Sequence, residues 1–327
     1  MNYHSVQRGV HMEITRVSIQ TIYRNIVNLF ITKGETLTLI DAGFKSEEGK
    51  QQVEDALRTM GYTLADVEQV VLTHHHPDHC GLVDAFPNAT IVGHPYCNHF
   101  LQPTEAFFAY YEKFHLHLLA QHGIHGVDAM LQDFMKSDME HFGTNPVTHF
   151  LAHGDEVPGM PGFVAHYTPG HCQSHLIYVN EQTGVSFGGD LILDTISPNP
   201  FVEPPLDLSL ERESSILKYH ASLAHTKELA IDALYTGHGE VVTDVRGRVA
   251  EILAEQRARA QKVQTFFEKG QRYTTVQIAK QLFGPVFFKQ PALTLSETLA
   301  QLDYLVQQQA LDLVRDNETY YYTLRTL

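Results

Sequence analysis

One short segment constrains this chain more than any other: the run His-His-His-Pro-Asp-His at residues 74–79. It follows the apolar stretch Val67–Leu72, which predicts a buried strand, and we expect the next helix to begin at Gly81. Imidazole and carboxylate groups are good ligands for zinc-like metals. The sequence therefore predicts a metal site where a strand ends.

The direction of each side chain in this segment can also be predicted. Because side chains alternate direction in an extended segment, His74 and His76 point one way and His75 the other. Asp78 and His79 turn back over the site as the chain enters the helix. Four ligands within six residues are more than one tetrahedral ion conveniently takes from a single loop, so the spacing predicts two metals side by side.

Three further candidate ligands each follow an apolar, β-rich run. They are His171, Asp190 and His238, and each has glycine beside it. Glycine lets the backbone come close and frees the ligand to turn inward. Ligands gathered at one end of a sheet need this arrangement.

This combination of motifs resembles the metallo-β-lactamase superfamily of hydrolases over about Ile14–Asp244. Five motifs occur in the family's order, and Asp41 matches the first, largely structural, one. The resemblance implies an α/β fold, a four-layer αββα sandwich with the metals at one edge. It also implies two ligand sets with one shared member: His74, His76 and His171 for one metal, Asp78, His79 and His238 for the other, and Asp190 between them.

The chemistry expected of such a site is hydrolysis by a hydroxide that bridges two divalent metals. Zn²⁺ is the expected metal, with Mn²⁺ and iron as alternatives. One metal would polarise the scissile carbonyl or phosphoryl oxygen, and the other would stabilise the leaving group. Asp78 and Asp190 are the predicted catalytic residues, because they can orient the water or relay a proton.

Other histidines and cysteines near these motifs have less definite roles. His175 lies four residues after His171 and is interpreted either as orienting a ligand or as structural. His75 is expected to be packed or to support a ligand. Nine histidines between His94 and His153 are interpreted as ordinary surface or core residues. Cys80 and Cys172 each follow a ligand and are interpreted as small buried fillers.

Histidine and charge divide the chain into two parts. All 21 histidines lie at or before His238. Residues 245–327 carry 11 Lys and Arg against 8 Asp and Glu, a net charge of +3, which leaves −18 for the rest of a chain whose total is −15. We therefore expect a hydrolase domain over residues 1–244 and a second domain over residues 245–327.

A helical insert is expected at about residues 95–158 of the first domain. Two helices are predicted there, Glu105–Leu119 and Val127–Phe142, in a stretch too long for a simple connection. Its large apolar side chains would form either a lid over the site or ordinary core. They are Phe107, Phe108, Tyr110, Tyr111, Phe114, Met130, Phe134 and Met135.

The second domain is predicted to contain three helices and a hairpin. The helices are Val245–Glu268, Thr274–Phe283 and Leu295–Gln309, followed by strands at Leu311–Arg315 and Thr319–Leu324. This order is typical of a winged helix, and the chain resembles the superfamily branch that carries such a tail. A winged helix that reads DNA has cations on its third helix, whereas this one has no Lys or Arg. We expect the tail to pack against the hydrolase domain or to form a dimer.

The composition of the chain limits the class of substrate and the cellular compartment that we expect. An acidic chain of 327 residues disfavours nucleic acid and anionic membranes as partners, and no apolar run approaches the ~20 residues that cross a bilayer. Three cysteines and the lack of a signal-peptide pattern lead us to expect the cytoplasm. We expect a small-molecule ester, thioester or lactone as substrate. The alternative is a single-strand-selective endoribonuclease guided by its tail, and homo-oligomer formation stays open.

Overall fold

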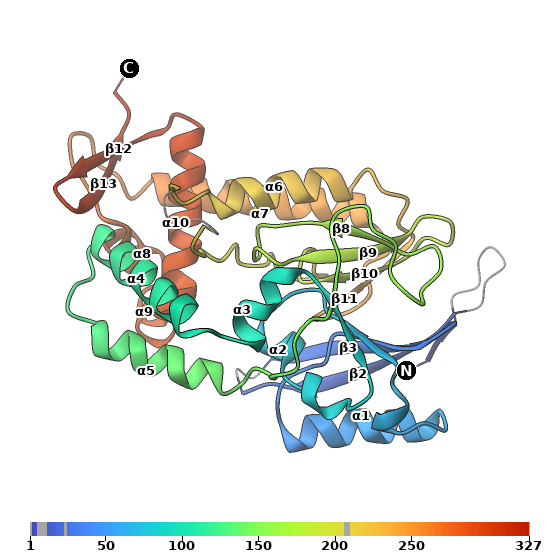
Figure 1. Cartoon of the computed structure of the whole chain (residues 1–327). Coiled ribbons are helices and arrows are strands. Elements are labelled where there is room, and N and C mark those ends of the chain that lie inside the picture. The colour runs from blue at the N-terminus through green and yellow to red at the C-terminus, as the bar shows by residue number, and fades with distance from the viewer. Residues whose placement is uncertain (1, 5–11, 23–24, 206–209, 327) are drawn as a thin grey trace.

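The computed structural model describes residues 2–4, 12–22, 25–205 and 210–326. Two β-sheets face each other, and helices cover their outer faces (Figure 1). The first sheet has seven strands in the order β1 to β7, antiparallel as far as β4 and parallel from there. Its strands are β1 Asn2–His4, β2 Glu13–Gln20, β3 Ile26–Lys33, β4 Leu37–Ile40, β5 Gln69–Val71, β6 Thr90–Gly93 and β7 His149–Phe150.

The second sheet has four strands in the order β11-β10-β9-β8. They are β8 Val164–Tyr167, β9 Leu176–Asn180, β10 Val185–Gly189 and β11 Ala233–Thr236. Strands β10 and β11 are parallel and the other pairs antiparallel. The rings of Phe30, Phe187 and Tyr235 pack between the two sheets with centroids 5.4–5.7 Å apart, which closes the inner layer of the sandwich.

Helices complete the outer layers. Helix α1 (Glu47–Thr59) lies on the first sheet and buries Val53 and Leu57 completely. Helices α6 (Ser215–Thr226) and α7 (Val245–Gln264) lie on the second sheet and pack apolar side chains against it. The αββα layers expected from the sequence are therefore present. Among the described residues, no helix combines the length and apolar character that crossing a membrane requires.

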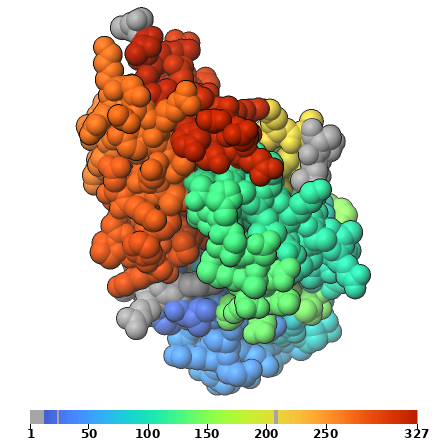
Figure 2. All heavy atoms as spheres, turned by 90° about the vertical axis from the view of Figure 1, so that its left-hand side faces the viewer, coloured from blue at the N-terminus to red at the C-terminus, as the bar shows by residue number. Residues whose placement is uncertain are grey.

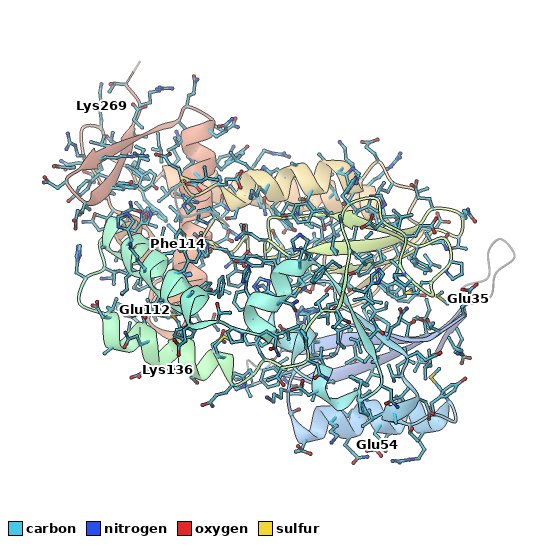
Figure 3. All side chains as sticks on the ribbon, in the orientation of Figure 1. Glu35, Glu54, Glu112, Phe114, Lys136 and Lys269 are labelled. Atoms are coloured by element: carbon cyan, nitrogen blue, oxygen red, sulfur yellow. The ribbon has the colours of Figure 1, made fainter. Side chains whose placement is uncertain are left out.

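The expected helical insert lies between β6 and β7. It contains α3 (Asn98–Leu101), α4 (Glu105–Gln121) and α5 (Asp128–Met139), while β7, also within residues 95–158, belongs to the first sheet. Phe107 and Tyr111 pack against the core beneath the first sheet, and Phe114 faces the tail (Figure 3). These three aromatic side chains are therefore part of the core, whereas Met130 and Phe134 of the same insert are exposed.

The tail continues from α7 and has one more helix than the sequence indicated. Its elements are α8 Thr275–Phe283, α9 Pro285–Lys289, α10 Pro291–Gln307, β12 Leu311–Asp316 and β13 Thr319–Leu324. Proline occupies the first position of α9 and of α10, where its fixed φ suits a helix start. Figure 2 shows the tail, orange to red, lying directly against the green helices of the insert.

Helix α10 is the centre of the tail and not its outer surface. Its residues from Thr294 to Leu302 are all buried, and it packs against α6, α7 and α8. Glu297, buried to 5 % exposure, pairs with Arg259 of α7. Arg212, before α6, forms two hydrogen bonds with Asp303. The tail and the hydrolase domain therefore share one packed interface.

One helix boundary beside the histidine motif was predicted wrongly. Helix α2 spans Pro77–Cys80, and Gly81 is its C-terminal cap instead of its start. Proline at the first helical position lacks only an N–H that would be unpaired there in any case. The early start matters, because it places Asp78 and His79 on the first turn of a helix.

Candidate metal centre

All of the predicted ligands lie at the edge where strands of both sheets end. The 74–79 segment follows β5, His171 follows β8, Asp190 follows β10 and His238 follows β11 (Figure 1). The segment from Leu72 to His76 is irregular, with a bend at Thr73 and extended backbone at His76, and it leads into α2. The structure thus brings together seven side chains from four separate loops.

The first group consists of three histidines whose ring nitrogens converge. Nδ1 of His76 lies 3.0 Å from Nε2 of His74 and 3.0 Å from Nε2 of His171. His75 points away, as alternation predicts: its Nδ1 lies 2.8 Å from Oγ of Ser174. All three converging nitrogens lie within 4.8 Å of one another, a spacing at which one metal ion can contact each.

The second group consists of Asp78, His79 and His238. Nε2 of His238 lies 3.4 Å from Oδ2 of Asp78, and Nε2 of His79 lies 3.9 Å from Oδ1 of the same carboxylate. These ligand atoms again lie within 4.8 Å of one another. A second possible metal position is therefore surrounded by three side chains. Two of them, a carboxylate and an imidazole, come from α2, and the third, an imidazole, comes from the loop after β11.

Asp190 lies between the two groups. Its Oδ1 is 3.5 Å from Nε2 of His79, and its Oδ2 is 3.3 Å from Nε2 of His238 and 3.7 Å from Nε2 of His171. Each group thus has a histidine within 3.7 Å of this one carboxylate. The arrangement suits a dinuclear centre in which Asp190 is shared.

In His74, His171 and His238 the second ring nitrogen is held by a partner outside the centre. Nδ1 of His171 donates to the carbonyl oxygen of Asn199 at 2.9 Å, and Nδ1 of His238 donates to that of Ile26 at 2.5 Å. Nδ1 of His74 lies 3.0 Å from the hydroxyl of Thr73. Such bonds fix the ring orientation and leave Nε2 with its lone pair facing inward.

Asp41 plays the structural part expected of it. Its carboxylate accepts bonds from the Thr73 N–H at 2.7 Å, the Thr73 hydroxyl at 2.8 Å and Nδ1 of His79 at 2.8 Å. Its φ is +59°, an unusual value for a residue with a side chain. One buried carboxylate therefore orients His79 and ties down the start of the histidine segment.

Two buried polar atoms at the centre show whether a metal fits. Nε2 of His79 and Oδ1 of Asp190 are buried, and neither has a regular hydrogen-bonding partner in the described part of the chain. Buried polar atoms are normally satisfied, and both of these are good metal ligands. Divalent metal ions between the two groups would satisfy them, so the residues fit the cofactor that the sequence implied.

A glycine makes this close approach feasible. A Cβ at Gly237 would lie 2.3 Å from Oδ1 of Asp190 and 2.6 Å from Cε1 of His79, too close for any side chain. Gly237 also donates its N–H to the carbonyl oxygen of Gly189 at 2.8 Å. The glycine before His238 thus brings the β10 and β11 loops together.

The pKa values of the histidines differ between the two ligand groups. Burial and neighbouring imidazoles hold the pKa values of His74 and His76 well below the usual range. Burial also lowers the pKa values of His79 and His238, but Asp190 and nearby carboxylates raise them by more. As a result, the pKa of His79 lies well above its usual value, and that of His238 is raised to about 10. The second group therefore releases protons when it takes up metal.

His175, left undecided from the sequence, orients the shared carboxylate. It is fully buried, and its Nε2 accepts the backbone N–H of Asp190 at 3.1 Å. Its Nδ1 lies 2.9 Å from the hydroxyl of Thr168. With both nitrogens engaged, His175 serves as a positioning residue.

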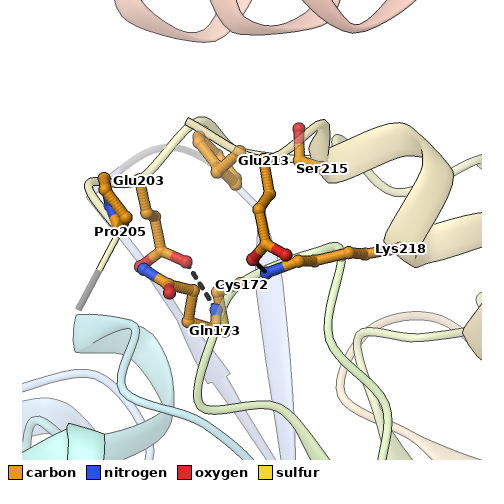
Figure 4. A pocket seen from close by; sticks show the side chains of 9 residues that line it. Cys172, Gln173, Glu203, Pro205, Glu213, Ser215 and Lys218 are labelled. Carbon is orange, nitrogen blue, oxygen red and sulfur yellow. Dashed lines mark hydrogen bonds and ion pairs between the residues drawn. The ribbon is translucent and has the colours of Figure 1, made fainter. Parts of the chain in front are cut away.

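Several residues beside the centre could not be predicted from motifs. Glu203 is buried, lies 3.2 Å from Nε2 of His75 and accepts the N–H of Gln173. Phe201 packs its ring 5.1 Å from His76 and 5.5 Å from His171. A small pocket opens beside them, where Lys218 pairs with Glu213 (Figure 4). The one sequence signal for this loop is its proline content between residues 198 and 205.

Comparison with known proteins agrees with this site. The sequence profile of the Metallo-beta-lactamase superfamily matches residues 24–238, a stretch that contains all seven candidate ligands. The chain is also 31% identical to the probable metallo-hydrolase YqjP of Bacillus subtilis (strain 168), with 90% of this chain and 92% of that protein covered. The chain belongs to the metallo-β-lactamase superfamily and is a probable metal-dependent hydrolase.

Solved structures resemble the whole chain, tail included. A metallo-beta-lactamase family protein from Thermus thermophilus has a TM-score of 0.78 at 26% identity, covering 96% of this chain and 98% of that one. A beta-lactamase domain protein from Burkholderia ambifaria has a TM-score of 0.72 at 21% identity, covering 96% and 92%. The hydrolase domain, insert and tail thus occur together in other proteins.

Proposed function

We propose that this protein hydrolyses a small-molecule ester, thioester or lactone with two zinc ions held by the seven residues of the metal centre. The observation that carries the proposal is the position of Asp190 between two complete ligand groups. His74, His76 and His171 would hold one ion, and Asp78, His79 and His238 the other. Zinc is proposed because it accepts mixed imidazole and carboxylate ligands in small coordination numbers.

Different residues of the site have different roles in the proposed reaction. When bound, a pair of such ions activates water near neutral pH and polarises the bond that is attacked. Burial opposes ionisation of Asp78, but its neighbours, His79 foremost among them, hold the pKa of this carboxyl group below its usual value, so it is ionised and can accept a proton. The ring of Phe201 shields His76 and His171 from water.

The position of the tail supports a small substrate. We propose that the tail has a winged-helix-like fold: three long helices are followed by the β12-β13 hairpin, and Tyr273 forms an isolated bridge with Tyr322 of β13. Its third long helix, α10, would be the nucleic-acid reader, yet this helix is largely buried and packs against α6, α7 and α8. We infer that the tail supports the hydrolase and does not guide RNA.

Two cations near the start of α7 are also engaged within the protein. Arg248 is 8 % exposed and binds the carbonyl oxygen of Leu193 together with Glu251 and Glu255. Arg246 binds the carbonyl oxygen of Lys227. These side chains hold α7 on the second sheet, which favours packing over phosphate binding. Three buried free cysteines among the described residues support our proposal that the protein is cytoplasmic.

Activity against two classes of substrate tests the proposal. Zinc-loaded protein is assayed with a panel of acyl-thioesters, esters and lactones and, in parallel, with labelled single-stranded RNA. We expect chelator-sensitive turnover in the small-molecule panel, loss of it in Asp190→Ala, and full activity in Asp133→Ala, which removes an exposed carboxylate on α5. Cleavage of RNA alone, abolished by Asp190→Ala, would establish the nuclease instead.

A further inference from the structure

A second cluster of histidines lies outside the metal centre. His153, His166 and His225 each offer a ring nitrogen, and these atoms lie within 4.8 Å of one another. Nδ1 of His166 is 3.0 Å from Nε2 of His225. The three ring centroids are 5.2–5.4 Å apart. The sequence pattern gave no sign of this, because the residues are separated by 13 and 59 positions, and His153 was interpreted as an ordinary histidine.

The cluster is remote from the candidate active site. His225 lies in the last turn of α6, whereas Ser215, at the other end of that helix, contacts the carbonyl oxygen of Pro200 in the loop that holds His171. The three histidines share no ligand with the two groups of the metal centre, so they would hold an ion of their own.

The three histidines come from different elements of the fold. His166 is on β8, in the second sheet, and is 9 % exposed. His153 is in the loop after β7, where the backbone of Gly154 and Asp155 pairs with Ala165 of β8. Ligands fixed on separate rigid elements need little reorganisation to receive an ion.

The geometry suits a tetrahedral ion. Two ligands at about 2.1 Å from such an ion lie about 3.4 Å from each other. The 3.0 Å between His166 and His225 is close to that value, and the same 3.0 Å separates ligand nitrogens in the metal centre. A third imidazole is at hand, and water can fill the fourth position because His153 is exposed.

The charge state also suits a cation. Burial and the two neighbouring imidazoles lower the pKa of His166 to about 4, so its ring is neutral at physiological pH and has a lone pair to give. The carboxylate of Glu181, on the turn between β9 and β10, adds negative charge near His166 and His225. Two hydrogen bonds must give way to the ion. Nδ1 of His166 and Nε2 of His225 share a proton at 3.0 Å, so one ring must change its tautomer. Nδ1 of His153 accepts the N–H of Tyr167 at 3.2 Å and must release it if that nitrogen is the ligand.

We propose that His153, His166 and His225 form a separate site for a divalent transition-metal ion that prefers imidazole, such as Zn²⁺ or Cu²⁺. Three neutral ligands and a partly exposed position make this site weaker than the first centre, which has carboxylates and is buried. Copper binds more tightly than zinc to the same nitrogen ligands. The ion would join the loop after β7, strand β8 and helix α6.

Calorimetry with Zn²⁺ on protein already loaded with two tightly bound zinc ions tests the proposal. We expect one further equivalent, lost in His153→Ala and in His225→Gln and retained in His149→Gln, which replaces an exposed histidine of β7. Cu²⁺ added to the same zinc-loaded protein should give an electron paramagnetic resonance spectrum with nitrogen hyperfine splitting that both cluster variants lose.

The controls separate this site from the first centre. All variants should keep the two tight zinc ions and the circular dichroism spectrum of the parent protein. If His225→Gln fails to fold, His153→Ala alone decides, because its side chain is exposed and supports little packing. The proposal is overturned if the zinc-loaded parent binds no further ion, or if the further equivalent persists in the folded cluster variants.

Discussion

The side-chain amide of Asn199 donates a hydrogen bond of 2.9 Å to the carbonyl oxygen of Leu293 on α10. The backbone carbonyl oxygen of Asn199 accepts a hydrogen bond from Nδ1 of His171. Three residues on, the N–H of Val202 donates to the hydroxyl of Ser296 at 2.8 Å. The loop that orients a metal ligand is therefore fastened to the tail at two points.

Loosening this loop should weaken metal binding without removing a ligand. Asn199→Ala breaks the bond to α10, so the carbonyl group that orients His171 gains freedom. We expect zinc affinity to fall about 10-fold, at the lower end of the range for supporting residues, because the direct bond to His171 can still form. Competition with a chromophoric chelator measures it. Asn88→Ala is the matched control, since Asn88 makes the same kind of bond, to Ala65, on a remote loop; equal affinities in both variants would contradict the coupling.

Asp41→Asn should disturb the second group of ligands. All three partners of this carboxylate are donors, so the amide nitrogen of asparagine must face an N–H or O–H group. His79 would then lose its fixed orientation, and we expect metal affinity to fall about 10- to 100-fold, as for other residues that support ligands. Elemental analysis after dialysis should find about one ion per chain in place of two. Retention of two ions would show that His79 does not depend on Asp41.

Gly237→Ala should expel metal by crowding. The new methyl group meets Asp190 and His79 at distances that no packed side chain tolerates. His79 is held by helix α2 and Asp41, and the backbone of Asp190 is held by His175. We expect a folded protein with most of its metal and activity lost. Gly34→Ala serves as the control, because the nearest atom to its Cβ is 3.8 Å away. Unchanged metal content in Gly237→Ala would mean that the two loops can separate freely.

The gathering of the candidate ligands could be predicted because each lies close to the element that places it. His171, Asp190 and His238 sit within a few residues of a strand end, so strand prediction indicated one shared edge, whereas the division into two ligand sets came from the resemblance to the family. Asn199 could not be found this way, since it acts through a backbone carbonyl group, which any residue possesses. Glu203 was missed because its partner His75 lies 128 positions away, and only folding brings the two together.

Helix boundaries were predicted less well where proline begins a helix. The expected third helix of the tail, Leu295–Gln309, in fact begins at Pro291, and α9 was not expected at all. Helix α6 was missed as well, although its Tyr219 and Leu223 are fully buried. At the first helical position proline favours a helix, which accounts for the starts of α9 and α10 but not for that of α6, whose first residue is Ser215.

The contact between insert and tail should weaken in acid. Nδ1 of His122, at the end of α4, lies 2.8 Å from the hydroxyl of Thr275 on α8. Burial, with a smaller effect of Arg212, lowers the pKa of His122 from 6.5 to about 3. Between these values the unfolded chain binds a proton that the folded chain excludes, so stability falls as pH is lowered through this window.

His122→Asn isolates this contribution, because asparagine offers an acceptor at the same place and does not titrate. One such histidine lowers the free energy of unfolding by up to about 2 kcal/mol when the pH falls from 7 to 5. Urea unfolding at the two pH values measures this loss. The free energy of unfolding should fall by up to about 2 kcal/mol less in the variant than in the parent. His125→Asn, which replaces an exposed histidine, should match the parent. A parent and His122→Asn with equal pH dependence would refute the assignment.

Removal of the tail should leave a chain that aggregates. Val249 and Ile252 of α7 are 1 % and 0 % exposed, and they pack with Leu223 of α6 over the second sheet. A chain ending at Asp244 would expose that surface, and large exposed apolar patches drive association. It would also lose the support of α10 for the loop at residues 199–203. Gel filtration should therefore show aggregates instead of a monomer, and elemental analysis should show less metal per chain than in the full protein. A monomeric, fully metallated fragment would show that the tail is a detachable module and would leave it free for another partner.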